Sequence, residues 1–216
     1  MNYKLAIFDM DGTILDTLQD LTDSINYALA QCGYPPRCGE DIKNFLGDGV
    51  WKLIERAAGE AAPQEHINKI HDVFISHYPE NCDIKTQPYK GIEDCIKTLK
   101  NAGCLTAVVS NKDDIAVKKL AQQYFPGMFD ISLGRRDGIP RKPAPDSVNE
   151  VLLMLNIDRK NAVYIGDSEV DISTAENALM DSIIVTWGFR DEEYLKSCGA
   201  KILIDSPEKI IKYILK

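Results

Sequence analysis

The sequence has little basic charge, and its cysteines are not spaced as metal ligands are. It carries 25 Lys and Arg residues against 33 Asp and Glu residues, which gives a net charge of −8 and a pI near 5.0. A protein that binds a nucleic-acid backbone needs a basic face, so nucleic acid is not an expected partner. The six cysteines form no CxxC pair, which argues against a zinc site or a thioredoxin-type redox motif.

Long hydrophobic runs are also missing. No stretch approaches the roughly 18 consecutive apolar residues of a membrane-spanning helix, and residues 1–12 lack the apolar segment of a signal peptide. The sequence contains no GxxxxGK[ST] phosphate-binding loop either, which excludes a nucleoside triphosphatase of that type. We therefore expect a cytoplasmic protein with no membrane partner and with reduced cysteines.

What the sequence does contain is the composition of a globular protein with an alternating α/β pattern. Its 216 residues are 44% hydrophobic and 27% charged, and a chain of this length buries about 70% of its surface. Short apolar runs, rich in β-branched residues, alternate with helical patterns, which predicts a doubly wound parallel sheet with a Rossmann-like core. The expected strands are Leu5–Phe8, Leu105–Val109, Asp130–Leu133, Ala162–Ile165, Ser182–Val185 and Ile202–Ile204.

One long segment breaks this alternation. Residues 17–83 show helical spacing of apolar side chains without a convincing strand. We therefore predict two domains, an α/β core formed by residues 1–16 and 84–216, and an inserted α-helical domain at 17–83. The chain is expected to re-enter the core near residues 87–91, a loop-like segment with proline and glycine.

The strongest chemical signal follows the first expected strand. Asp9 and Asp11 stand two residues apart in the segment Asp9–Thr13, at the carboxyl end of a buried strand, where open parallel sheets bind ligands. Two carboxylates placed there are costly unless a cation accompanies them. The alternative is a simple turn or helix cap that uses Asp-Gly chemistry.

A similar acidic pattern follows a second strand. Asp167 directly follows the strand that ends at Gly166, and Asp171 falls one turn into the next helix. By itself this pattern is also typical of a helix N-cap. Because it repeats the first motif at another strand end, the carboxylates are expected to converge on a hard cation such as Mg²⁺, which takes few protein oxygens together with water and phosphate.

Two further strand ends carry groups suited to an anion. Three prolines within residues 140–145 stiffen the loop around Lys142, and a fixed lysine suits a phosphoryl oxygen as a point charge. Ser110 and Asn111 follow another strand, and a hydroxyl with main-chain amides before a helix could cradle phosphate. The alternatives are solvated basic residues at a helix start and an ordinary N-cap.

These four motifs resemble the haloacid dehalogenase superfamily, and within it the phosphatases that carry a helical cap after the first motif. In chain order they are Asp9–Thr13, Ser110–Asn111, Lys142 and Asp167–Asp171. The inserted segment, with Gly47, Gly49 and Arg56, is similar to the cap of phosphoglycolate phosphatases, and residues 186–189 resemble the same group. The chain departs from the pattern at Lys90, where relatives often have a second proline.

The resemblance implies a role for each motif residue. Asp9 is the expected nucleophile, which forms an aspartyl-phosphate, and Asp11 is the general acid and base. Asp171 is expected to orient Lys142 or a metal-bound water. The implied phosphate-binding residues are Gly12, Thr13, Ser110, Asn111 and Lys142, and the implied Mg²⁺ ligands are Asp9, the backbone carbonyl of Asp11, and Asp167.

The expected function is Mg²⁺-dependent hydrolysis of small phosphomonoesters, with phosphoglycolate as the leading substrate. The partner is a small phosphorylated metabolite, and the acidic surface slightly favours a monomer or a weak homodimer. Gly47, Gly49 and Arg56 are candidates for reading the substrate, although a solvated or structural role for Arg56 is the favoured interpretation. Two other functions stay open: a β-phosphoglucomutase-like phosphomutase, and a phospho-acceptor signalling module.

Overall fold

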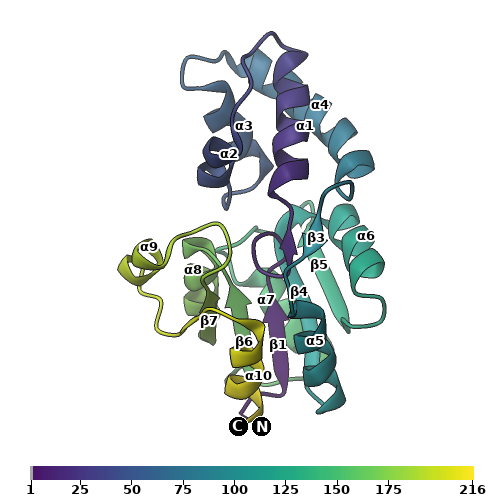
Figure 1. The fold of residues 1–216 in the computed structure, drawn as a ribbon, viewed down its shortest axis with the longest axis vertical. Coiled ribbons are helices and arrows are strands. Elements are labelled where there is room, and N and C mark those ends of the chain that lie inside the picture. The colour runs from purple at the N-terminus through teal and green to yellow at the C-terminus, as the bar shows by residue number, and fades with distance from the viewer. Residues whose placement is uncertain (1) are drawn as a thin grey trace. The chain divides into compact units, whose positions relative to one another are not determined.

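The computed structural model describes residues 2–216 (Figure 1). The chain divides into two compact units, one formed by residues 2–15 and Pro88–Lys216 and the other by Asp16–Gln87. We call the first the sheet unit and the second the helical unit. Within residues 2–216, no helix combines the length and the apolar character needed to cross a membrane.

The sheet unit is built on a six-stranded sheet with the order β5-β4-β1-β6-β7-β8, and all of its strand pairs are parallel. The first strand of the chain lies near the centre, and later strands add on both sides of it, which is the doubly wound arrangement that the sequence predicts. Each expected strand is present within a few residues of its predicted bounds. The strands are β1 (Leu5–Phe8), β4 (Leu105–Asp113), β5 (Ile131–Arg135), β6 (Ala162–Gly166), β7 (Asp181–Val185) and β8 (Leu203–Ile204).

Helices cover both faces of this sheet, which explains why its strands read as continuous apolar runs. On one face, Ile7 and Val109 belong to a buried cluster that includes Val148 and Val151 of α7 and Ala175 of α8. Figure 1 shows α5 and α10 on the other side of the sheet. The helices are α5 (Ile92–Asn101), α6 (Asp114–Tyr124), α7 (Asp146–Leu155), α8 (Glu169–Asn177), α9 (Glu192–Ser197) and α10 (Pro207–Leu215), with a short 3₁₀ turn η1 (Arg159–Asn161).

The helical unit is a small bundle in which α1 packs on the other three helices. Its core is formed by side chains that recur at helical spacing, such as Ile25 and Leu29 of α1, Ile54 of α3 and Phe74 of α4, all of them buried. Two short strands, β2 (Leu15–Asp16) and β3 (Gln87–Pro88), pair where the chain passes from one unit to the other. The helices are α1 (Leu18–Ala30), α2 (Gly39–Phe45), α3 (Val50–Ala58) and α4 (Gln64–Asn81).

A buried carboxylate explains why the compact unit extends to Gln87, beyond the expected boundary at residue 83. Asp20 in the first turn of α1 is only 2% exposed. Its oxygens accept hydrogen bonds of 2.8–3.0 Å from the main-chain N–H groups of Lys85 and Thr86. The returning segment is therefore tied to the start of the helical unit, because a buried carboxylate needs donors to offset its lost hydration.

Candidate active site

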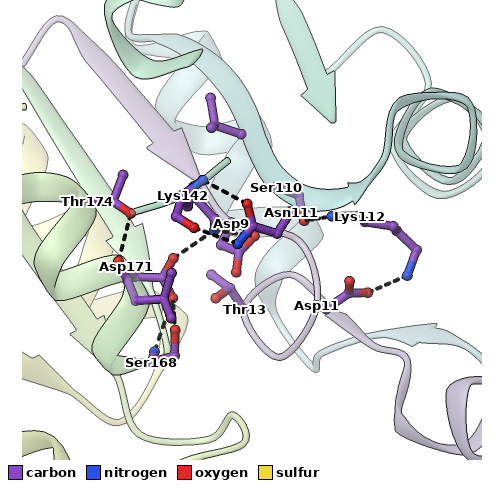
Figure 2. Close-up of polar contacts among 12 residues, drawn as sticks. Asp9, Asp11, Thr13, Ser110, Asn111, Lys112, Lys142, Ser168, Asp171 and Thr174 are labelled. Atoms are coloured by element: carbon purple, nitrogen blue, oxygen red, sulfur yellow. Dashed lines mark hydrogen bonds and ion pairs between the residues drawn. The ribbon is translucent and has the colours of Figure 1, made fainter. Parts of the chain in front are cut away.

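The acidic motifs meet at one edge of the sheet because β1 and β6 are adjacent and parallel. Asp9 follows β1, and its main-chain N–H donates to the carbonyl of Ile165 at 2.8 Å. One carboxylate oxygen from each of Asp9, Asp167 and Asp171 lies within 4.8 Å of the others, and all three residues are buried. Figure 2 shows Asp9 between Lys142 and the loop that carries Asp11. The structure thus brings these three predicted site residues together.

Burial dominates the electrostatics of this carboxylate cluster. It raises the pKa of Asp9 to about 7, against the opposing attraction of Lys142. Burial also holds the pKa of Asp167 well above its ordinary value, and the charges of Asp171 and Asp9 add to the effect. Several carboxylates in a dry site repel one another, so the cluster needs positive charge to stay ionised near neutral pH.

Lys142 supplies one such charge. Its Nζ lies 2.9 Å from Asp9 Oδ1, 2.8 Å from Asp171 Oδ1 and 3.0 Å from the hydroxyl of Tyr164. Burial alone would lower the pKa of this lysine, but the carboxylates of Asp171 and Asp9 outweigh burial and raise the pKa well above its ordinary value. Lys142 is therefore a fixed ammonium group beside Asp9.

Asn111 holds the main chain of Lys142 in place. Its Nδ2 donates to the Lys142 carbonyl at 3.1 Å, and its Oδ1 accepts from the Lys142 N–H at 2.8 Å. The expected strand end at Val109 is wrong, because β4 continues to Asp113, with a shift in its register with β5 between Val109 and Asp113. Ser110 and Asn111 therefore lie within the irregular end of β4, and Asp113 caps α6 by accepting a hydrogen bond from the Ile115 N–H.

Asp171 uses both of its oxygens within the site. Oδ2 accepts from the main-chain N–H groups of Asp167 and Ser168, each at 3.1 Å, and from the Ser168 hydroxyl at 2.6 Å, while Oδ1 takes the Lys142 ammonium. The arrangement with Ser168 is the capping box of α8. Asp171 therefore joins the Asp167 loop to Lys142.

The carboxylate of Asp167 is held from two sides. Oδ1 accepts from the Thr13 hydroxyl at 2.9 Å, and Oδ2 accepts from the Phe189 N–H at 2.8 Å. Gly12 passes directly beside this carboxylate with φ +81°, and a side chain at residue 12 would collide with it. Glycine is required at this position both by the left-handed backbone and by the close approach.

The turn that carries Gly12 and Thr13 satisfies its own amides. The Gly12 N–H donates to the Leu15 carbonyl at 2.9 Å, and the Thr13 N–H donates to the Met10 carbonyl at 3.2 Å. These two amides would have to give up those bonds in order to bind a phosphate oxygen. Their predicted place in a phosphate site stays a prediction.

The donor set fits a small hard cation. Asp9 Oδ1 is buried and accepts no hydrogen bond, because its contact with Lys142 is an ion pair outside hydrogen-bonding angles. Each oxygen of Asp167 accepts one hydrogen bond and keeps a lone pair. Carboxylate oxygens without enough donors are the ligands that Mg²⁺ prefers. Asp9 and Asp167 could therefore hold the ion, with Asp171 engaged by its neighbours.

Lys112 also lies in the site, although the sequence suggests no role for it. Its Nζ lies 2.7 Å from Asp11 Oδ1, and Figure 2 shows the Asp11 carboxylate turned towards this ammonium. No local pattern in the sequence pointed to this contact, because the expected strand ended at Val109 and the register of β4 with β5 shifts between Val109 and Asp113.

The candidate substrate-reading residues lie in the helical unit, in the loop before α3 and on α3 itself. Gly47 and Gly49 both have positive φ, and Gly49 directly precedes the helix. The guanidinium of Arg56 donates to the Phe45 carbonyl at 2.8 Å and to Asp48 at 2.5 Å. Arg56 thus braces this loop, which is the structural role left open by the sequence. Substrate reading by these residues stays a prediction.

Comparison with known proteins yields one family and many relatives. The family described as haloacid dehalogenase-like hydrolase matches residues 6–185. A phosphoglycolate phosphatase of Psychrobacter arcticus is 34% identical over all of this chain and 97% of its own length. An N-acetylmuramic acid 6-phosphate phosphatase of Pseudomonas aeruginosa is 27% identical over 98% of this chain and 94% of its own. A crystal structure from Lactobacillus delbrueckii subsp. bulgaricus, proposed to be a phosphoglycolate phosphatase, superimposes with a TM-score of 0.94 at 44% identity over 99% of both chains.

Proposed function

Because the chain belongs to the haloacid dehalogenase-like hydrolase family, we propose that it hydrolyses small phosphomonoesters through an aspartyl-phosphate formed on Asp9. The chain is a phosphatase of this family, as are relatives that match most or all of its length. The observation that carries the proposal is the position of Asp9. Its carboxylate lies in a buried cluster with Asp167 and Asp171 and has a fixed ammonium 2.9 Å away.

In the proposed first step, an Asp9 oxygen attacks phosphorus and the ester oxygen departs. The leaving oxygen takes a proton from the carboxyl group of Asp11, which stands two residues further along the same turn. In the second step, water attacks phosphorus and Asp11 takes its proton. The Asp9 carboxylate is then regenerated and inorganic phosphate is released.

Positive charge and donors hold the phosphoryl oxygens during both steps. Lys142 is buried and immobile, so its ammonium is in place before the substrate binds, and this preorganisation is what makes electrostatic stabilisation effective. The Ser110 hydroxyl and the Asn111 N–H are the further donors that we propose. Mg²⁺ bound at Asp9, Asp167 and the Asp11 carbonyl would neutralise phosphoryl charge.

We propose 2-phosphoglycolate as the leading substrate and assign the helical unit as the cap that selects it. Supporting this choice, the Psychrobacter relative carries that substrate in its name. The Pseudomonas relative is named for a phosphorylated amino sugar acid, so both compounds belong in a substrate panel. The two share a carboxylate as well as a phosphate, which makes a carboxylated phosphomonoester the class to test first.

The test is steady release of inorganic phosphate from that panel with Mg²⁺, measured as kcat/KM for each ester. Asp9→Asn should lower phosphate release by at least about 1,000-fold, because it removes the nucleophile. Asp205→Asn makes the same chemical change at an exposed ion pair of the sheet unit and should stay within about twofold of wild type. Substantial activity in Asp9→Asn would show that another residue is the nucleophile.

The same assay separates the two alternative functions. A phosphomutase protects its phosphoenzyme from water and would release little phosphate, and a phospho-acceptor module would stay phosphorylated for minutes without turnover. Steady release at many turnovers per active site would exclude both. A monomer or weak homodimer is our expectation for the assembly, and sedimentation at micromolar concentration tests it.

A further inference from the structure

Two buried lysines form ion pairs with different carboxylates of the candidate active site. Lys142 pairs with Asp9 and Asp171, and Lys112 pairs with Asp11 at 2.7 Å. The Lys112 side chain is only 3% exposed, while that of Asp11 is 20% exposed. Burying an ammonium group is costly unless it is paired and held, so a lysine in this place calls for a reason beyond surface charge.

The fold explains how Lys112 reaches Asp11. In the pairing of β1 with β4, Phe8 lies opposite Val108. Asp11 therefore follows β1 at about the level where Lys112 stands in the extension of β4. β4 continues past this pair to Asp113, with a shift in its register with β5 between Val109 and Asp113. This irregular end of β4 brings the Lys112 ammonium to Asp11.

We propose that Lys112 is a positioning residue for Asp11, which it holds beside the nucleophile so that the carboxyl group can exchange a proton with the leaving oxygen. This inference rests on the proposed function. The ammonium contacts Oδ1, which leaves Oδ2 for the proton transfer. Asp11 lies outside the named strands and helices, at an isolated bridge to Leu15 beside a turn, and its contact with Lys112 gives its side chain a defined direction.

Two other roles for Lys112 make different predictions. A lysine that bound the phosphoryl group directly would lower the barrier for every ester, whatever its leaving group. A purely structural lysine would change stability and affect all esters alike. Positioning of the general acid matters only when the leaving oxygen is basic enough to need a proton, so the loss of activity should depend on the leaving group.

The test uses phenyl, 4-nitrophenyl and 2,4-dinitrophenyl phosphate, which share a shape and differ in the basicity of the leaving oxygen. For Lys112→Met, kcat/KM should fall about 30-fold for phenyl phosphate and less than about threefold for the dinitrophenyl ester, as a fraction of the roughly 100- to 10,000-fold contribution of general acid catalysis. An equal loss for all three esters, or no loss, would overturn the inference. If Lys112→Met does not fold, Lys112→Leu also removes the donor at this site and is judged by the same criterion.

A double variant asks whether the effect passes through Asp11. On the background of Asp11→Asn, adding Lys112→Met should change kcat/KM for phenyl phosphate by less than about twofold, because coupled residues are not additive. A full additional 30-fold loss would mean that Lys112 acts independently of Asp11, and the inference would be wrong.

The matched control removes another lysine of an ion pair. Lys118 pairs with Asp114 at 2.6 Å on the next helix of the chain, and its side chain is 61% exposed. Lys118→Met should leave all three esters within about twofold of wild type. If the wild-type protein hydrolysed none of the esters, the proposed function itself would fail, whereas a uniform loss in an active Lys112 variant would reject only the role of Lys112.

Discussion

The strand ends of the sheet unit and the surface of the helical unit differ in where their charged side chains lie. In the sheet unit, the charged side chains at the strand ends are buried and touch one another. In the helical unit, three ion pairs lie at the surface with side chains 33–53% exposed: Lys52–Glu55, Arg56–Asp48 and Lys85–Asp23. Because exposed pairs contribute little to stability and buried charges cost much, the contrast marks the strand ends as the place where charge serves chemistry.

Asp20 is the informative exception in the helical unit. It is buried, yet its donors are the main-chain amides of Lys85 and Thr86 rather than another charged side chain. The Asp20 carboxylate is satisfied by amides and ties two segments together, whereas Asp9 Oδ1 is buried and accepts no hydrogen bond. Burial alone therefore does not identify a site. A shortage of donors among buried charges does.

The largest expected effect comes from removing the central cation of the sheet unit. Lys142→Met leaves Asp9 and Asp171 without their ammonium, and we expect the free energy of unfolding in EDTA to fall by about 3 kcal/mol, as for other broken buried pairs. Urea denaturation at pH 8 measures it. A loss below about 1 kcal/mol would show that water already screens these carboxylates, and the contrast between the units would weaken.

Binding of Mg²⁺ should stabilise the protein through the sheet unit alone, by nearly as much as Lys142→Met destabilises it. Saturating Mg²⁺ at about 100 times its Kd should raise the free energy of unfolding by about 2.7 kcal/mol. Asp167→Asn should abolish most of this gain, and Asp72→Asn, at an exposed carboxylate of the helical unit, should leave it intact. Equal gains in both variants would place the ion elsewhere.

The pH dependence of the metal-free protein follows from the same cluster. Burial raises the pKa of Asp9 from an unfolded value near 4 to about 7. The folded protein therefore holds the Asp9 proton more tightly than the unfolded chain does. The contribution of this proton to the free energy of unfolding is fully present below about pH 4 and is lost as pH rises through 7. In EDTA, stability should fall across this window, and Mg²⁺ should reverse the fall. A flat profile would mean that Asp9 is solvated.

Gly12 and Gly33 allow a comparison between a crowded position in the sheet unit and an open position in the helical unit. Gly12 and Gly33 have similar φ values of +81° and +76°, but a side chain at Gly12 meets Asp167, while nothing lies within 4 Å of Gly33. Gly33→Ala should cost about 1 kcal/mol for its left-handed backbone. Gly12→Ala should cost about 1 kcal/mol more, because a packed neighbour must also shift. Equal losses in urea denaturation would show that the site around Gly12 gives way freely.

The smallest effect belongs to the surface of the helical unit. Lys52→Met breaks the exposed pair with Glu55 and should change the free energy of unfolding by less than about 0.5 kcal/mol. Thermal denaturation in 0.05 M and 0.5 M salt checks the result, since added salt should screen the pair and remove any difference in stability between the variant and wild type. A loss comparable to that of Lys142→Met would contradict the contrast between the units.

The family and the enzyme class were predictable because the chemistry-bearing residues follow short apolar strands. Asp9 stands directly after Phe8, and Asp167 directly after Gly166, so locating the strands located the carboxylates. Parallel strands present their carboxyl ends at one edge, and this rule brings together residues more than 150 positions apart in the chain.

Other parts of the site could not be predicted in this way. The extent of β4 depends on its pairing with β5, a long-range contact that propensity does not report, and this extension places Lys112 against Asp11. The clamp of Asn111 on the main chain of Lys142, and the bond from the Phe189 N–H to Asp167, join segments with no local pattern between them.

By itself, the sequence determined the parallel sheet, the inserted helical segment and the identity of the residues at the strand ends, because hydrophobic periodicity and turn residues act over a few positions. Only the tertiary structure decided which charge faces which. An interaction of Asp171 with Lys142 was expected, whereas the contacts of Lys142 with Asp9 and of Lys112 with Asp11 were not. These contacts depend on strand register and burial, which emerge only when the strands pair and water is excluded between them.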